Sequence, residues 1–294
     1  MILCAGEALI DMLPRDTPEG SAFLPVVGGS VFNTARACAR LGAPTAMFTG
    51  LSTDLFGQRL HAALTADGVA DRTHRSDRPT TLAFVTLTDG QAEYAFYDEN
   101  TAARTVDIAD APPMDDVTAL FLGCISLAVE PCATAYEALA DANPGLPLYL
   151  DTNIRAGFVA DEAAYRARLD RLMSRAAMVK MSDDDAAWLG LSAADVLDRG
   201  ASVVCTTHGA DGVTAHTARG RVHVPAVAVT VVDTVGAGDT FNGGFLAGLH
   251  EAGALHRDVP DDDVLRLALE LGARAAAITV SRAGANPPTR AEIV

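Results

Sequence analysis

Two aspartates flank a glycine-rich turn in the segment DTVGAGDTF, residues 233–241. A helix that begins at such a turn offers unpaired N–H groups and the positive end of its dipole, and bare residues let an anion approach that backbone. Gly236, Ala237 and Gly238 therefore predict an anion hole. A carboxylate at its rim would repel the anion, so Asp239 makes chemical sense as a base that takes a proton from a hydroxyl. The alternative is a simple N-cap, because aspartate is common at that position.

A hydroxyl, a base and an anion hole together indicate phosphoryl transfer to an alcohol, in which the protein mostly positions groups and neutralises charge. The sequence has no GxxxxGK[ST] loop, and no GxGxxG follows its first strand, which disfavours P-loop enzymes and dinucleotide oxidoreductases. The formal charge of −16 argues against nucleic acid as a partner. Small anionic ligands stay open, because backbone N–H groups and a metal ion can hold them.

A second group of candidate site residues, Asp11, Gly28, Gly29 and Asn33, lies about 200 residues before the glycine turn in the sequence. Gly28 and Gly29 permit close approach of a ligand to the backbone. Asn33 falls on the first turn of the next helix, where its amide can bind hydroxyls. Asp11 follows an apolar run and could accept two hydroxyl protons from a polyol or form a strand-end cap, and the residues alone leave both readings open.

Composition bounds the class of protein. The 294 residues allow one large domain or a large and a small one, and the 49% apolar content is ample for a core. No apolar run reaches the length of a membrane span, and the N-terminal segment lacks the basic start of a signal peptide. The five scattered cysteines form no CxxC pair and indicate buried, reduced thiols. We therefore expect a cytoplasmic protein with no membrane partner.

Strands and helices alternate along most of the chain, which predicts parallel strands and a layered α/β sheet. Strands are expected at 2–13, 45–51, 118–125, 147–152, 176–181, 202–207 and in the β-branched run 227–232. Helices are expected at 30–42, 54–66, 131–142, 161–175, 183–190, after Gly238 and at 261–278. Segments 80–89 and 91–99 alternate with a period of two around Asp89–Gly90 and predict a hairpin, as do 214–217 and 221–227. The first hairpin fits poorly in a parallel sheet and predicts a small β-rich appendage.

The segments that contain these two groups of residues resemble the signature regions of the PfkB, or ribokinase-like, carbohydrate kinases. Residues 28–35 match GGxxxNxA, 233–239 match DTxGAGD, and GLSTDLFG at 50–57 loosely matches a GxDxFG motif. The likeness covers nearly the whole chain and ends at 280–289, which resemble the closing strand and turn of the family. It implies one domain over 1–294, with a three-layer α/β/α sandwich and a small β-sheet lid from segments about 10–27 and 78–105.

The resemblance implies roles for particular residues. Asp239 corresponds to the base, with Gly236, Ala237 and Gly238 as the hole for the transferred phosphoryl group. The implied sugar contacts are Asp11, Gly28, Gly29 and Asn33. The DxNxR segment of the family appears as Asp151, Asn153 and Arg155, of which Arg155 can pair with phosphate. The implied nucleotide contacts are Lys180 (the only lysine), Ser182, Gly238, the turn 207–212 with Thr207, Gly209 and Gly212, and the small residues Ala273 and Ala276 beside the adenine.

One motif departs from the family. Its usual Asn-x-x-Glu, which orders Mg²⁺ through water, appears here as Ser182 and Asp185. Asp185 is one methylene shorter than glutamate, and Ser-x-x-Asp can also be a capping box, so Asp183 or Asp184 could take its place. Asp233, Val235 and Ser281 lie where relatives hold a monovalent cation such as K⁺.

The opening GEALIDMLP resembles fructokinases, and residues 96–104 lie where the lid returns to the substrate, with Asp98, Asn100 and Arg104 as candidate contacts. The prediction is a sugar kinase that uses ATP and Mg²⁺ to phosphorylate a primary hydroxyl of D-fructose. The alternatives are a 2-keto-3-deoxygluconate kinase, favoured by Arg104, another sugar or nucleoside kinase of the family, and a non-catalytic sugar or nucleotide sensor. Relatives that pair through their lids imply a homodimer.

Overall fold

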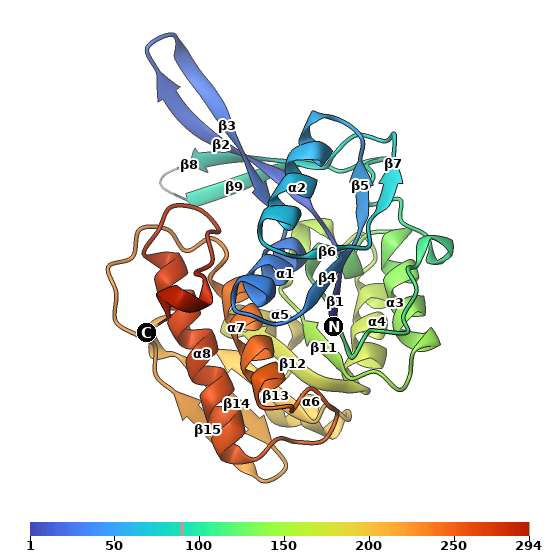
Figure 1. Cartoon of the computed structure of the whole chain (residues 1–294), viewed down its shortest axis with the longest axis vertical. Coiled ribbons are helices and arrows are strands. Elements are labelled where there is room, and N and C mark those ends of the chain that lie inside the picture. The colour runs from blue at the N-terminus through green and yellow to red at the C-terminus, as the bar shows by residue number, and fades with distance from the viewer. Residues whose placement is uncertain (89–90, 294) are drawn as a thin grey trace.

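A large mixed sheet forms the middle layer of the computed structural model, which describes residues 1–88 and 91–293 and side chains outside 86–94 (Figure 1). Its nine strands follow the order β15-β14-β13-β12-β11-β10-β1-β4-β6, and all pair in parallel except β14 and β15. The strands are β1 (Ile2–Ala5), β4 (Thr45–Phe48), β6 (Ala70–Asp71), β10 (Ala119–Gly123), β11 (Leu148–Asp151), β12 (Ala176–Ser182), β13 (Val203–Thr207), β14 (Val213–Thr217) and β15 (Gly220–Val224).

Helices cover both faces of this sheet, with α1, α7 and α8 on one side and α3 and α4 on the other (Figure 1). The period of two in β1 produces the two faces: Ile2 and Cys4 join the core under α1 and α7, whereas Leu3 and Ala5 join the core under α3 and α4. The helices are α1 (Ser30–Arg40), α2 (Leu55–Ala66), α3 (Cys132–Ala142), α4 (Glu162–Met173), α5 (Asp183–Leu189), α6 (Ala193–Asp198), α7 (Ala237–Glu251) and α8 (Asp262–Val280). The expected three-layer sandwich is confirmed.

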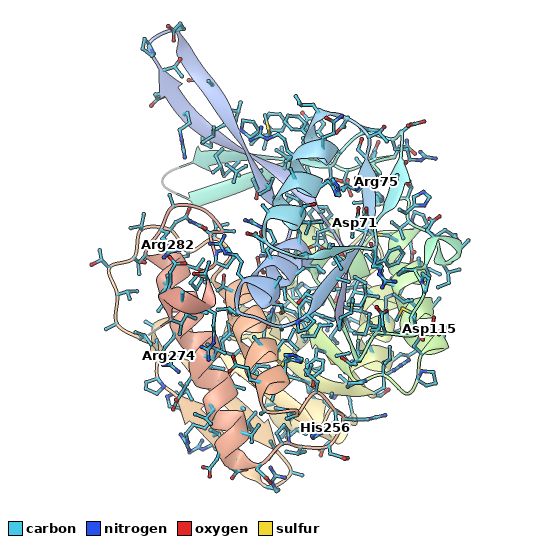
Figure 2. The ribbon with its side chains drawn as sticks, viewed as in Figure 1. Asp71, Arg75, Asp115, His256, Arg274 and Arg282 are labelled. Atoms are coloured by element: carbon cyan, nitrogen blue, oxygen red, sulfur yellow. The ribbon has the colours of Figure 1, made fainter. Side chains whose placement is uncertain are left out.

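A separate four-stranded sheet lies at one end of the molecule, where the β2–β3 hairpin projects beyond the helices (Figure 1). Its order is β3-β2-β8-β9, from β2 (Leu9–Thr17), β3 (Gly20–Gly28), β8 (Leu82–Thr88) and β9 (Gln91–Tyr97). Two short strands, β5 (Gly50–Ser52) and β7 (His74–Ser76), pair nearby. An ion pair of 2.8 Å joins Arg75 of β7 to Asp71 of β6 (Figure 2). In the described chain no helix is both long and apolar enough to cross a bilayer.

Some local predictions were wrong. The predicted strand 2–13 is two strands in two sheets, β1 and β2, with residues 6–8 between them. The β-branched run 227–232 forms no strand: Pro225 follows the edge strand β15 and brings no N–H to a ladder, and Val231 is 61% exposed. No strand occurs within residues 281–293, and the carbonyl of Val280 instead accepts N–H bonds from Val232 and Asp233. The predicted turn at Asp89–Gly90 lies outside the described residues.

Candidate active site

Asp239 lies on the first turn of α7 and is buried. The N-cap of α7 is Gly236, so Asp239 is not the cap. Its Oδ1 accepts a hydrogen bond of 2.7 Å from Ser30 Oγ, and its Oδ2 accepts one of 2.9 Å from Asn33 Nδ2. Both donors belong to α1, so the two polar groups that are far apart in sequence meet at this carboxylate.

Burial raises the pKa of Asp239, and the carboxylate of Asp151 raises it further, while the Ser30 and Asn33 donors act in the opposite direction. A carboxylate with a raised pKa holds a proton more readily once it has taken one from a substrate. Its electrostatic setting therefore suits Asp239 to accept a proton.

The glycine turn beside Asp239 has no room for side chains. Gly236 has φ 76°, and a Cβ there would lie 2.6 Å from the Cβ of Ala285. A Cβ on Gly238 would lie 3.1 Å from Lys180 Nζ. Gly236, Ala237 and Gly238 line the cavity described below, so the N-terminus of α7 faces it, with the Lys180 ammonium group beside Gly238.

Lys180 is 4% exposed, and its Nζ lies 3.0 Å from Asp151 Oδ1. Burial alone would lower the pKa of Lys180, but the carboxylates of Asp151, Asp185 and Asp239 together outweigh it and the pKa is raised, so the ammonium stays charged. Asp151 Oδ2 also accepts a bond of 2.7 Å from Asn242 Nδ2. Asp151 and Lys180 form a buried ion pair beneath the turn.

Asp239 and the glycine turn line a cavity of about 310 Å³ together with Asp11, Asn33 and Arg155. Burial, with a contribution from Asp239, raises the pKa of Asp11 to about 6. The Oδ1 of Asn33 is buried and has no hydrogen-bond partner among the described residues. Arg155 forms no ion pair with any described residue and lines the same cavity. The cavity thus holds acceptors for hydroxyls and a cation for an anion.

The two adjacent glycines of the first motif differ in what they do. Gly29 lines the cavity, whereas Gly28 does not. A Cβ on Gly28 would lie 2.2 Å from Asp11 Oδ2. Gly28 therefore makes room for the Asp11 carboxylate.

A second cavity of about 560 Å³ adjoins the first and shares Phe96 and Arg155 with it. The predicted substrate residues Asp98 and Arg104 line this second cavity, where they form an ion pair of 3.0 Å. Phe158 also lines it, and its ring centroid lies 4.3 Å from that of Phe96. The structure therefore does not bring Asp98 and Arg104 to Asp239. Asn100, which has φ 56°, accepts a bond of 3.5 Å from Arg78 Nη1 and lines neither cavity.

Residues 1–292 match the model of the pfkB family of carbohydrate kinases. The chain belongs to this family. Among curated relatives it is 49% identical to a fructokinase of Rhizobium leguminosarum bv. trifolii over 85% of this chain and 79% of the relative. It is similar to the crystal structure of a fructokinase with bound ATP from Xylella fastidiosa, with 29% identity and a TM-score of 0.89 over 99% of this chain and 96% of the other. A fructokinase double mutant from Vibrio cholerae O395, in a fructose, ADP and potassium ion bound form, matches with 25% identity and a TM-score of 0.84 over 97% and 93%.

Asp185 of this carbohydrate kinase is tied to backbone on both sides. Its Oδ1 accepts from Ile154 N at 2.7 Å and its Oδ2 from Ser182 N at 2.8 Å, while Ser182 Oγ accepts from Asp185 N at 3.0 Å. The predicted capping box is confirmed. Asp183 instead lies 2.9 Å from His208 Nδ1, and no group of three or more His, Cys, Asp or Glu that could hold a metal occurs within residues 1–88 and 91–293.

The predicted nucleotide turn of the kinase follows β13, and Gly209 and Gly212 adopt φ 55° and 98°. A Cβ on Gly212 would lie 2.2 Å from Val224 O, so that glycine is required where the turn meets β15. Ala273 and Ala276 lie on α8, partly buried against the core, and line neither of the two cavities. Thr207 ends β13 beside this turn.

The residues predicted to hold a monovalent cation lie where two loops meet. Asp233 Oδ1 accepts from Val235 N at 3.0 Å and its Oδ2 from Gly284 N at 2.8 Å. Ser281 Oγ donates to Ile278 O at 2.7 Å at the end of α8. Asp233 therefore ties the glycine turn to the loop after α8.

Sequence reasoning missed two residues that contact the centre of this kinase. Ser30 stands between the Asp239 carboxylate and Asn153, whose Nδ2 donates to Ser30 Oγ at 2.8 Å. Glu7 lines the same cavity from the loop between β1 and β2. A signal existed for Ser30, a hydroxyl directly after Gly28–Gly29, but nothing in the spacing distinguishes it from a helix-start serine.

Proposed function

We propose that this carbohydrate kinase is a fructokinase that transfers the γ-phosphoryl group of ATP to the 6-hydroxyl of D-fructose. The observation that carries the proposal is the buried Asp239 carboxylate at the rim of a glycine turn, with acceptors for hydroxyls on the same cavity wall. The similar proteins, which include a fructokinase with bound ATP and one with fructose and ADP, support this choice of substrates.

The reaction follows from the positions of these groups. The sugar enters the cavity with hydroxyls donating to Asp11 and to the free Oδ1 of Asn33. Asp239 takes the proton of the 6-hydroxyl, the oxygen forms a bond to the γ-phosphorus, and the bond from phosphorus to the β-phosphate oxygen breaks to release ADP. The N–H groups of the glycine turn and Lys180 behind them stabilise the charge on the transferred group.

Arg155 is the cation that faces this reaction from the cavity wall. Because no described residue forms an ion pair with it, its guanidinium can pair with a phosphate oxygen without breaking an ion pair, although its Nη1 also donates to Ile154 O at 3.2 Å. We assign the nucleotide to the turn 207–212 and the α8 residues Ala273 and Ala276, with Ser182 at the start of α5, as the family resemblance implies.

A bound Mg²⁺ would supply positive charge to the phosphates, and Asp185 is the residue that would hold it through water. Both Asp185 oxygens already accept backbone N–H bonds and keep further lone pairs, a donor set that suits a metal held through water better than direct ligation. K⁺ is assigned to the turn with Asp233, Val235 and Ser281, where carboxylate, hydroxyl and main-chain oxygens are available. Titration of activity with each ion tests these assignments.

The separate sheet is proposed as a lid that closes over the sugar and excludes water. It carries exposed aromatic rings: Phe23 is 42% and Tyr97 64% exposed, and both contact Phe84 edge to face at 5.0 and 5.4 Å. This apolar surface supports a homodimer through the lid, which light scattering of the wild type and of Phe23→Glu tests. The five buried cysteines, none in a disulfide, support a reducing, cytoplasmic setting.

The deciding experiment measures ADP release from ATP and Mg²⁺ with fructose, ribose, 2-keto-3-deoxygluconate, tagatose and adenosine as acceptors. Fructose is expected to give the highest kcat/KM, and Asp239→Asn is expected to lower kcat by about 10²- to 10⁴-fold. Asp258→Asn, an exposed aspartate of the loop after α7, is the matched control and keeps the wild-type rate. Another leading sugar would replace fructose and leave the mechanism, whereas saturable sugar binding without ADP release would establish a sensor.

A further inference from the structure

Glu7 is a buried carboxylate that the reaction described above does not use. It is 5% exposed and lies in the loop where β1 gives way to β2. Its Oε1 accepts hydrogen bonds from Ser30 N at 2.8 Å and from Val31 N at 3.3 Å. Its Oε2 accepts from the hydroxyl of Ser126. A full charge placed this deeply needs a reason, because burying it unpaired is unfavourable.

Glu7 supplies the cap that α1 lacks in its own sequence. The N-cap residue of α1 is Gly29, with φ 107° and no side chain, and the first turn of α1 contains no acidic residue. The first N–H groups of a helix need acceptors, and a negative charge there also interacts favourably with the helix dipole. Glu7 fills both needs from a different part of the chain.

Three hydrogen bonds reach the carboxyl oxygens of Glu7 in the described structure. Ser126 Oγ already accepts the N–H of Glu7 at 2.8 Å, so its proton is free to point at Oε2. Ser30 and Val31 offer backbone N–H groups. Burial raises the pKa of Glu7 and the Asp239 carboxylate adds to the rise, whereas the Ser126 hydroxyl and the backbone N–H groups oppose it without cancelling it.

The helix held by Glu7 carries both donors to the base. Ser30 Oγ reaches Asp239 Oδ1 at 2.7 Å, and Asn33 Nδ2 reaches Oδ2 at 2.9 Å. The loop that contains Glu7 packs closely against α1. A Cβ on Gly29 would lie 2.8 Å from Glu7 O, and a Cβ on Gly6 would lie 2.5 Å from a methyl of Val31. A shift of the Glu7 carboxyl would therefore move Ser30, and through its hydroxyl the Asp239 carboxylate.

We propose that Glu7 is a positioning residue of this kinase, which acts through Ser30 to hold the Asp239 carboxylate in line with the substrate hydroxyl. Its carboxyl oxygens accept hydrogen bonds from Ser30 N, Val31 N and the Ser126 hydroxyl, so the proposal gives it no direct role on the reacting atoms. The inference deepens the proposed function and rests on Asp239 as the base. It assigns a catalytic consequence to a buried acid that would otherwise count only toward stability.

A double-mutant cycle tests the inference with Glu7→Gln, Ser30→Ala and the double variant. Glu7→Gln keeps shape but turns an acceptor into a donor, and we expect kcat to fall about 10- to 100-fold, because misplacement of reacting groups by about 1 Å costs about 10²-fold. KM for ATP stays within about twofold. Because Glu7 acts through Ser30, the double variant loses no more than the worse single variant.

Glu137→Gln is the matched control, because Glu137 is another shielded glutamate whose partners, Arg168 and Arg171, lie outside both cavities. It should lower the melting temperature and leave kcat unchanged. If Glu7→Gln does not fold, Ser126→Ala replaces it in the cycle, since it removes a single donor to Glu7.

Additive losses in the cycle, or a kcat for Glu7→Gln or Ser126→Ala within twofold of the wild type, would overturn the positioning role. The cycle uses whichever sugar the wild type phosphorylates best, so a wrong sugar does not affect it. A fully active Asp239→Asn enzyme would instead remove the base assignment itself, which separates failure of the proposed function from failure of this inference.

Discussion

Gly236→Ala separates two reasons for a glycine at the rim of the anion hole. The residue has φ 76°, a left-handed conformation that costs an alanine about 1–2 kcal/mol. Its Cβ would also lie 2.6 Å from the Cβ and 3.0 Å from the Cα of Ala285, against a favourable carbon–carbon separation of about 3.5–4.0 Å. The backbone of one of the two loops must then move by roughly 1 Å, and overpacking of this kind costs about 1–3 kcal/mol.

Gly253→Ala is the matched control at the other end of the same helix, since Gly253 follows α7 with φ 65° and nothing lies within 4 Å of a Cβ there. We expect both variants to lose a few degrees of melting temperature through φ strain, by the usual scaling of about 2–4 °C per kcal/mol. Only Gly236→Ala should lose kcat, by about 10- to 100-fold, because the N–H groups of the hole move with the loop.

The assay is steady-state kcat on the best sugar together with thermal unfolding of both variants. Equal kcat for Gly236→Ala and Gly253→Ala, at equal losses of melting temperature, would refute the reasoning. It would mean that the turn adjusts without disturbing the hole, and that Gly236 is needed for its backbone angle alone.

Three further outcomes follow from the site. Lys180→Met leaves the Asp151 carboxylate buried without its cation and should cost about 3–5 kcal/mol of folding free energy, measured by denaturant unfolding, with recovery on adding Asp151→Asn. The pKa of Asp11 is raised to about 6, so the ionised acceptor is lost as pH falls through that value: KM for the sugar should rise between pH 7 and pH 5 in the wild type and stay flat in Asp11→Asn. Phe158 lines the second cavity and contacts Phe96, which lines both cavities. Phe158→Ala removes this ring and should raise kcat/KM for adenosine relative to fructose in the acceptor panel.

The centre of the site could be predicted from the sequence because the type of each residue there, and its place in the predicted elements, indicate its chemical role. Asp239 beside bare residues, Asn33 at a helix start and Asp11 near the end of the first predicted strand indicated base, amide and acceptor, and the structure brings all three to one cavity. The alternation of strands and helices likewise predicted the layered sheet, since the period of two in β1 and the helical faces leave few other arrangements.

What the sequence could not show depends on three-dimensional contacts. Glu7 resembles any glutamate near a strand until the fold places it under α1. Arg104 looked available to a substrate, but its ion pair with Asp98 in the neighbouring cavity occupies it. The valine run 227–232 has the composition of a strand but forms none. β-propensity reports how well a residue packs against a neighbouring strand, and in the described sheet no strand pairs with β15 on its outer side.

The burial of Lys180 also makes the molecule unusual as a target of chemical labelling. It is the chain's single lysine and is 4% exposed, so lysine-directed acylating reagents find no ε-amine on the surface of the closed protein. Acylation at Lys180 then requires the region beneath the glycine turn to open, and its rate reports that local opening. Mass spectrometry of one modified peptide could thus follow how sugar and nucleotide tighten the site, without a probe engineered into the chain.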